Sequence, residues 1–237
     1  MALANSNFVA NDVSLGNGST VSLLTGSNMA GKSTLMKQVC IVAIMGQIGC
    51  YVPCRFAHFS VVDKIFSRIG ASDRLNLGKS TFFIELEDMK RMVDEASEDS
   101  FCIVDELGRG TSLTEGVAIA SAFLSELSGM KLRCFFSTHL HNLLKFSRMD
   151  ANIKYQKMSI LIDDDGKLNF VHKLEDGATK SSFGIKVAKL AGIEDSIIEK
   201  AKEKSLMYDA KMIGNYLETD EVYKSIMTEI GLESLII

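Results

Sequence analysis

One short segment constrains the fold of this chain more than any other. Residues Gly26–Ser33 read GSNMAGKS and match the pattern G-x-x-x-x-G-K-[ST] in full. The segment follows a β-rich run, Thr20–Thr25, and opens a helical stretch that reaches about Gly46. Glycines let backbone N–H groups curl around a phosphate group, and a helix N-terminus adds positive potential. A strand, a loop and a helix in this order predict a nucleotide site; the alternative is a plain glycine-rich turn.

Side-chain chemistry predicts the roles within this segment. Lys32 is expected to reach the β and γ phosphates, and the Ser33 hydroxyl to bind Mg²⁺. The residues expected to contact the nucleotide here are Gly26, Ser27, Asn28, Met29, Ala30, Gly31, Lys32, Ser33 and Thr34.

Strand and helix patterns alternate along the rest of the chain. Phe101–Asp105 and Arg133–Thr138 are apolar runs that predict buried strands, and apolar residues recur at helical spacing before and between them. An α/β fold with a mainly parallel sheet flanked by helices follows. Met158–Ile162 and Lys167–Leu174 flank an Asp-Gly turn and predict a small antiparallel edge.

The expected domain organisation is one α/β domain, residues 1–192, followed by a helical tail, residues 193–237. Helix formers dominate the tail and glycine is scarce in it. Its apolar face, formed by Ile197, Ile198, Ala201 and Leu206, and its hydrophobic end, Leu235–Ile237, predict a dimerisation element.

Two acids follow the second predicted strand. Asp105 is its last residue and Glu106 comes directly after it. Behind a phosphate-binding loop, Asp105 is expected to hold Mg²⁺ and Glu106 to orient or activate the attacking water. Without that loop, two solvated acids at a strand end would be an equally good interpretation.

Composition excludes several classes of protein. The 237 residues carry 26 Lys and Arg against 30 Asp and Glu, a net charge of −4, so the chain has no overall basic field to attract nucleic acid. Five cysteines without a C-x-x-C pair indicate reduced thiols. The first twenty residues lack a signal-peptide pattern, and Val39–Val52 is too short to span a bilayer. The sequence therefore predicts a protein that is neither secreted nor embedded in a membrane.

Five segments occur in the order and at the spacing of a known family. They are Thr25–Thr34 (TGSNMAGKST), Tyr51–Pro53 (YVP), Ser80–Leu86 (STFFIEL), Val104–Ser112 (VDELGRGTS) and Ser137–His139 (STH). In these segments the chain resembles the C-terminal ATPase domain of the MutS family of DNA mismatch repair proteins. The resemblance covers about residues 5–205 and implies a P-loop NTPase fold of the ABC-ATPase type. Segments such as Gly49–Pro53 look most like the larger subunit of the eukaryotic base-mismatch heterodimer.

The resemblance implies a catalytic set and a nucleotide-binding set. Glu106, Lys32 and His139 are the expected catalytic residues, and His139 matches the family's switch histidine near the γ-phosphate. Asn28 matches an asparagine that approaches the same phosphate. Metal binding is assigned to Ser33 and Asp105.

Three further residues match family positions far from the loop. Phe8 and His172 match a ring pair that sandwiches adenine. Ser80 matches a serine that is presented to the nucleotide of the opposite subunit. Ser80 could instead simply cap the helix that follows it.

The resemblance also implies cofactors, partners and a location. We expect ATP and Mg²⁺ as ligands and a second MutS-type subunit, in a homodimer or a heterodimer, as the main partner. Mismatched double-stranded DNA would be bound through N-terminal domains that are absent from these residues, and a MutL-type protein is a further expected partner. If the protein is eukaryotic, as that likeness implies, we expect it in the nucleus. If it is not eukaryotic, we expect it in the cytoplasm.

Departures from the family pattern keep alternatives open. Ser27 stands where the family usually has proline and Ala30 where it usually has glycine, so a Cβ could crowd the phosphate loop and reduce affinity or turnover. The chain could then be an impaired dimerisation or scaffold module. Another ABC-class ATPase is a second alternative, although no L-S-G-G-type signature precedes Phe101.

Overall fold

The computed structural model describes residues 8–207, apart from 17, 71–79, 148–149, 164–167, 180 and 182. The chain divides into two compact units, Met1–Ser182 and Phe183–Ile237. The sheet and the predicted nucleotide site belong to the first unit. The second contains α5 (Gly184–Leu190) and a helix over residues 195–207. The rest of the predicted tail, including Leu235–Ile237, lies outside the described residues.

The first unit contains a six-stranded sheet in the described part of the chain, with the order β2-β3-β4-β1-β5-β6. Strands β1 to β5 run parallel, and β6 pairs antiparallel with β5. The mainly parallel sheet with an antiparallel edge is therefore confirmed. The strands are β1 (Val21–Thr25), β2 (Ile65–Arg68), β3 (Phe101–Asp105), β4 (Arg133–Thr138), β5 (Ile153–Ile162) and β6 (Leu168–Asp176).

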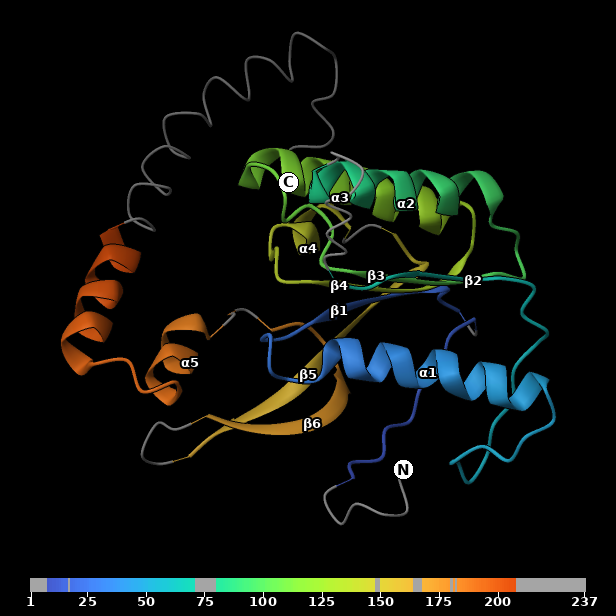
Figure 1. The fold of residues 1–237 in the computed structure, drawn as a ribbon, viewed down its shortest axis with the longest axis horizontal. Coiled ribbons are helices and arrows are strands. Elements are labelled where there is room, and N and C mark those ends of the chain that lie inside the picture. Colours follow the sequence, from blue (N-terminus) through green and yellow to red (C-terminus); the bar gives the residue numbers. More distant parts are fainter. Residues whose placement is uncertain are drawn as a thin grey trace, which may run out of the picture. The chain divides into compact units, whose positions relative to one another are not determined.

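Helices cover both faces of this sheet. One face carries α1, and the other carries α2, α3 and the short α4 (Figure 1). Their bounds are α1 (Lys32–Gln47), α2 (Thr81–Glu95), α3 (Leu113–Gly129) and α4 (Leu143–Phe146). The flanking helices expected from the alternating pattern are thus present.

Two strands differ from the sequence prediction. β5 begins at Ile153, five residues before the expected Met158, because its first half pairs with β1 in the interior of the sheet although it includes Lys154 and Gln156. β2 was not predicted, since a four-residue strand ending in Arg68 has no alternating or continuous apolar pattern. The predicted Asp-Gly turn falls on residues 164–167, outside the described residues.

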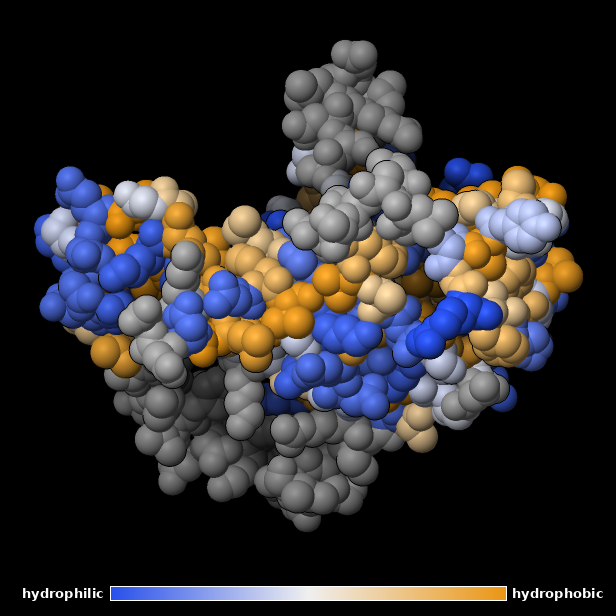
Figure 2. Space-filling model, turned by 90° about the horizontal axis from the view of Figure 1, so that it is seen from below, coloured by the Kyte–Doolittle hydropathy of each residue, from blue (hydrophilic) through white to orange (hydrophobic). Residues whose placement is uncertain are grey.

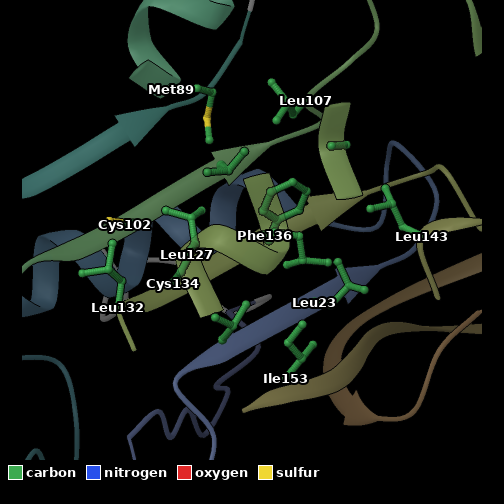
Figure 3. Packing of buried hydrophobic residues seen from close by; sticks show 14 of the residues in the cluster. Leu23, Met89, Cys102, Leu107, Leu127, Leu132, Cys134, Phe136, Leu143 and Ile153 are labelled. Atoms are coloured by element: carbon green, nitrogen blue, oxygen red, sulfur yellow. The ribbon is translucent and has the colours of Figure 1, made fainter. Parts of the chain in front are cut away.

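The central strands are apolar on both faces, as expected for parallel strands covered by helices. Phe136 lies in the cluster beneath α2 and α3 (Figure 3), whereas its neighbour Phe135 lies in the cluster beneath α1. Phe135 and Phe101 pack edge to face, with ring centroids 6.2 Å apart. The fully buried phenylalanines of β4 thus join two apolar clusters across one sheet.

Exposed apolar side chains concentrate at one end of α1. Figure 2 shows the face of the molecule on the α1 side, where hydrophobic surface gathers towards the end of α1 and the segment that follows it. The residues are Ile41, Ile44, Ile48, Tyr51, Phe56 and Val61. This end of the helix is opposite to the one that follows β1.

Candidate functional site

The predicted site residues converge at one edge of the sheet. β1, β4 and β3 are neighbouring parallel strands, so their carboxyl ends lie side by side. The Gly26–Ser33 loop follows β1, and the acids Asp105 and Glu106 stand at the end of β3. Ser137 and Thr138 end β4. Functional sites in open α/β sheets form at this edge.

The Gly26–Ser33 loop contains two glycines with positive φ angles. Gly31 has φ 99° in the left-handed region and caps the N-terminus of α1, a conformation that glycine adopts without the Cβ penalty. A Cβ on Gly31 would lie 3.2 Å from the Nδ1 atom of His172. His172 also hydrogen-bonds through Nδ1 to the Ala30 carbonyl at 3.0 Å. The imidazole of β6 is therefore packed against the start of α1.

The methyl group of Ala30 is turned into the protein interior. Ala30 is fully buried and belongs to the cluster beneath α1, with Leu24, Met36 and Met158. The Cβ that was expected from the sequence to crowd the phosphate loop is thus surrounded by apolar side chains. Whether turnover is reduced remains a separate, functional prediction.

The side chain of Lys32 turns back onto the loop that precedes its helix. Its ammonium donates hydrogen bonds to the carbonyls of Gly26 at 2.7 Å and Ser27 at 3.1 Å, and lies 3.6 Å from Glu106 Oε1. The side chain is only 3% exposed. Burial lowers the pKa of Lys32, and the charges of Glu106 and Asp105 oppose that shift.

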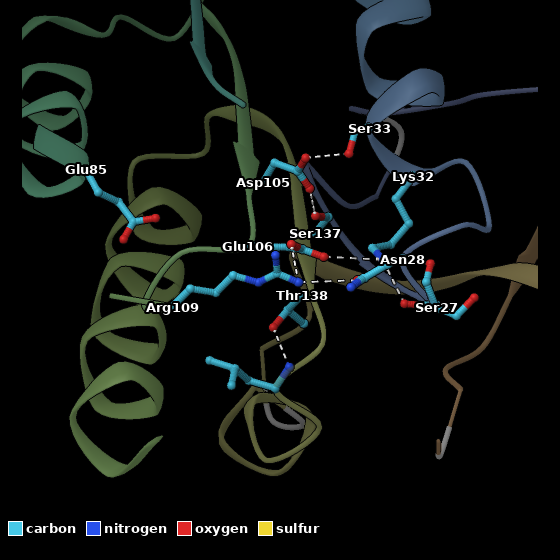
Figure 4. Close-up of polar contacts among 12 residues, drawn as sticks. Ser27, Asn28, Lys32, Ser33, Glu85, Asp105, Glu106, Arg109, Ser137 and Thr138 are labelled. Carbon is cyan, nitrogen blue, oxygen red and sulfur yellow. Dashed lines mark hydrogen bonds and ion pairs between the residues drawn. The ribbon is translucent and has the colours of Figure 1, made fainter. Parts of the chain in front are cut away.

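Asp105 accepts hydrogen bonds from two hydroxyl groups. Ser33 Oγ donates to Oδ2 at 2.5 Å, and Ser137 Oγ donates to Oδ1. Figure 4 shows all three side chains meeting between the strand ends and α1. Ser33 and Asp105, the two residues predicted to hold Mg²⁺, are therefore in contact although they lie 72 residues apart in the sequence.

Glu106 is held between two cations. Arg109 Nη2 lies 2.6 Å from its Oε2, and Lys32 contacts its other oxygen. Arg109 also donates to Asn28 Oδ1 at 3.3 Å, which links the acid to the loop (Figure 4). Glu106 has φ 57°, in the left-handed region that is unfavourable for a residue with a side chain. Strain of this kind persists only where the surrounding contacts hold it.

Two buried polar atoms beside these residues have no hydrogen-bond partner among the described residues. They are Ser27 Oγ and His139 Nδ1. Burial lowers the pKa of His139, and the positive charge of Arg109 lowers it further, so its neutral form is favoured near pH 7. A neutral histidine with an unsatisfied nitrogen can accept a hydrogen bond from a ligand or donate one to it, depending on the tautomer.

The predicted adenine-binding rings are not in contact with each other. In the described part of the chain the ring stacked on His172 is that of Phe170, with centroids 6.3 Å apart. Phe8 is 43% exposed. Its segment does run along β6, because Asn11 hydrogen-bonds to the carbonyl of His172 and to the N–H of Leu174.

Ser80 is the N-cap of α2. Its hydroxyl accepts a hydrogen bond from the N–H of Phe83 at 3.2 Å, and the residue is exposed. The capping interpretation of Ser80 is therefore confirmed. Presentation to another subunit is compatible with this exposure and stays a prediction.

Several side chains that line or support the site, Arg109 among them, were not predicted as site residues from the sequence. Ser137 was part of a family segment, but its bond to Asp105 was not foreseen. Arg68 and Glu85 form a buried ion pair and, with Asp105, Glu106 and other residues, line a cavity of about 210 Å³. No local pattern could have identified Arg68, because its partner lies on another element.

The described residues contain no group of three or more His, Cys, Asp or Glu side chains that could hold a metal ion. A protein cage is not needed for Mg²⁺, which usually takes one or two protein oxygens together with phosphates and waters. The Ser33–Asp105 pair fits that requirement. No helix in the described residues has the length and hydropathy to cross a membrane.

Comparisons with known proteins agree on one family. Residues 22–208 match MutS domain V. The DNA mismatch repair protein MutS of Ehrlichia chaffeensis is 42% identical over 200 residues, which cover 84% of this chain and 25% of that protein. MutS of Caldanaerobacter subterraneus is 39% identical over 235 residues, covering 98% of this chain and 27% of that protein. The chain spans about a quarter of the length of these relatives.

These relatives correct two expectations. Both organisms are bacteria, so the likeness to the larger subunit of the eukaryotic heterodimer is not supported, and the nuclear location that it implied is wrong. That likeness rested on short segments such as Gly49–Pro53, which carry less information than an identity of about 40% over 200 residues. The family assignment itself is confirmed: the chain belongs to the MutS family of DNA mismatch repair proteins, and residues 22–208 correspond to its domain V.

Proposed function

We propose that this chain is the ATP-binding and ATP-hydrolysing module of a MutS-type mismatch repair protein, with a P-loop fold of the ABC-ATPase type. The observation that carries the proposal is the contact of the Gly26–Ser33 loop with the acids after β3. Ser33 reaches Asp105 at 2.5 Å and Lys32 reaches Glu106 at 3.6 Å. A plain glycine-rich turn would not need a lysine and a serine directed at two carboxylates.

The side chains of this site have distinct proposed tasks. Lys32, which here donates to its own loop carbonyls, exchanges those bonds for the β and γ phosphates of ATP. Mg²⁺ bound near Ser33 and Asp105 supplies positive charge to the phosphates. Glu106 positions the attacking water, with Arg109 and Lys32 fixing its carboxylate.

The nucleotide contacts predicted from the family belong to the same proposal. Asn28 and His139 lie close to the γ-phosphate, and His139 has a buried nitrogen available for a hydrogen bond. Phe8 and His172 hold adenine, which requires their rings to be apart rather than in contact.

We further propose that the site is completed by a second MutS-type chain. Ser80, exposed at the start of α2, and the 108–112 loop are the groups offered to that chain. ATP binding then closes the pair and hydrolysis reopens it. Mismatched DNA and a MutL-type protein would interact with the assembled protein, largely through regions beyond this quarter-length chain.

The variant Glu106→Gln tests the catalytic part of this proposal. It removes the charge that orients water while leaving Lys32 and Ser33 in place, so nucleotide affinity should stay within about threefold and turnover should fall by about 100-fold or more. Affinity is measured by equilibrium titration with a fluorescent ATP analogue, and turnover by phosphate release.

A matched control is Glu95→Gln. Glu95 ends α2 and forms an exposed ion pair with Arg91, so its neutralisation should change neither quantity. If the parent chain binds ATP but has no turnover to lose, even when a partner chain is present, the catalytic proposal is wrong. The chain would then be a nucleotide-binding scaffold.

Concentration tests the composite site. Turnover per chain should rise with chain concentration, or on addition of a second MutS-type chain, because each site is complete only in a pair. If turnover per chain depends neither on chain concentration nor on a second chain, the paired site is wrong. Each chain would then hydrolyse ATP by itself.

A further inference from the structure

A buried ion pair stands beside the nucleotide site without a role in the proposed function. Arg68 Nη2 lies 3.2 Å from Glu85 Oε1, and the two side chains are 8% and 6% exposed. Burial of charged groups is costly unless each is paired and hydrogen-bonded. Burial raises the pKa of Glu85, while the charge of Arg68 opposes that shift. A buried ion pair is therefore weak evidence for stability, and the contacts that it makes are the better guide to its role.

The pair joins three elements that meet at the end of β3. Arg68 ends β2 and is in register with Val104, the residue before Asp105. Glu85 lies on α2 and projects towards the loop that carries Arg109 (Figure 4). The Glu85 carboxylate also faces the backbone N–H of Gly108, which counteracts the rise in the pKa of Glu85. α2 packs on the same turn, because a Cβ on Gly110 would lie 2.6 Å from the Cβ of Phe82. One carboxylate thus ties β2 and α2 to the turn that follows Glu106.

That turn is tightly packed on its other side. A Cβ on Gly108 would lie 2.7 Å from the carbonyl oxygen of Gly116, at the start of α3. The backbone of the turn is therefore confined between α3 and the carboxylate of Glu85. Glu106, two residues earlier, has a φ of 57°, a strained backbone conformation that needs support from its surroundings.

We propose that the Arg68–Glu85 ion pair is a positioning pair: it holds the Gly108 turn, and through this turn it sets the direction of the Glu106 carboxylate in the nucleotide site. This inference rests on the proposed ATPase function, since it assigns Glu106 as the residue to be positioned. Among the described residues, Glu85 makes no hydrogen bond or ion pair with the Gly26–Ser33 loop, so its effect should reach turnover rather than nucleotide affinity.

Three variants separate positioning from general support. Glu85→Ala removes both the ion pair and the carboxylate that faces Gly108. Glu85→Gln removes the charge and keeps an oxygen that faces the Gly108 N–H. Asp88→Asn is the control, because the half-exposed Asp88 lies 3.8 Å from the same guanidinium and, among the described residues, makes no hydrogen bond to the turn.

We measure kcat at saturating ATP, nucleotide affinity by fluorescent titration, and amide hydrogen exchange of residues 107–112, all at one chain and partner concentration. Glu85→Ala should lower kcat by about tenfold or more, with affinity within about threefold, and should speed exchange at Gly108. Glu85→Gln should fall between Glu85→Ala and the parent. Asp88→Asn should stay within about twofold of the parent in every measurement.

Two outcomes would overturn the positioning role. One is a Glu85→Ala chain with kcat within twofold of the parent or unchanged exchange at Gly108. The other is an equal loss of affinity and turnover, which would assign the pair to nucleotide binding. If Glu85→Ala does not fold, Glu85→Gln and Arg68→Lys decide by the same criteria. A parent that neither binds nor hydrolyses ATP refutes the proposed function instead, and exchange at Gly108 then still decides whether Glu85 holds the turn.

Discussion

The methyl group of Ala30 is fully buried among Leu24, Met36 and Met158, beneath the loop that precedes α1. In the family pattern this position usually holds glycine, so the methyl group could have faced a bound phosphate. Its burial indicates that it fills space in the core. At the scale of single residues, the alanine at position 30, which departs from the family pattern, therefore contributes to core packing.

The variant Ala30→Gly should therefore cost stability. Loss of a buried methyl group and the added backbone freedom of glycine should lower the free energy of unfolding by about 1–2 kcal/mol, measured by urea denaturation. Nucleotide affinity should not increase by more than about twofold. The control Ala57→Gly, at an exposed position, should change stability by about 0.5 kcal/mol or less. A large gain in affinity for Ala30→Gly would restore the idea of a crowded phosphate loop.

At the scale of elements, α3 supports the site through its first turn. Ser112 caps this helix by accepting the N–H of Glu115, and Gly116 packs against the backbone of the Gly108 turn. A Cβ on Gly116 would lie 2.4 Å from the carbonyl oxygen of Gly108, far inside contact distance. The helix can approach this closely only because its residue there is glycine.

The two glycines of α3 should respond to alanine in opposite directions. Gly116→Ala should lower the free energy of unfolding by about 1–3 kcal/mol and should reduce ATP turnover, because backbone atoms of the turn must shift. Gly129→Ala, at the other end of the helix with nothing within 4 Å of the added Cβ, should raise stability by about 0.5–1 kcal/mol. Thermal and urea unfolding of both variants are the measurements. Similar effects from the two substitutions would contradict the close approach of α3 and the turn.

At the scale of the whole molecule, the net charge of the chain limits its affinity for DNA. A net charge of −4 offers little attraction for a polyanion, and the chain spans about a quarter of its relatives' length. The Gly26–Ser33 loop and the acids that it contacts lie within these residues. Tight binding of DNA requires a basic surface, and a chain with a net charge of −4 has little excess positive charge to form one.

We therefore predict that this chain alone binds duplex DNA weakly. Fluorescence anisotropy with a labelled duplex, with or without one G·T mismatch, should give dissociation constants above about 10 μM at about 150 mM salt, and no preference for the mismatch. ATP should not change this result. Binding below about 1 μM with a steep salt dependence would show that the chain has a DNA-binding surface of its own.

Much of this architecture follows from short runs of consecutive residues. Phe101–Asp105 and Arg133–Thr138 are strands to the residue, because a continuous apolar run bounded by polar residues favours a buried strand. The Gly26–Ser33 motif likewise predicts where a phosphate-binding loop would lie, since its glycines and the following helix are adjacent in sequence. Ile65–Arg68 could not be predicted in this way, because its strand conformation depends on pairing with β3.

The sequence by itself determined the α/β class, the family, and the identity of the acids after β3, because each depends on local pattern or on motif spacing. The tertiary structure decided which side chains meet: Ser137 with Asp105, Arg109 with Asn28, Arg68 with Glu85, and His172 with the carbonyl of Ala30. It also decided that the Phe170 ring stacks on His172. Such contacts join residues that are distant in sequence or on separate elements, so they depend on strand order and helix packing, which backbone propensity and periodicity do not encode.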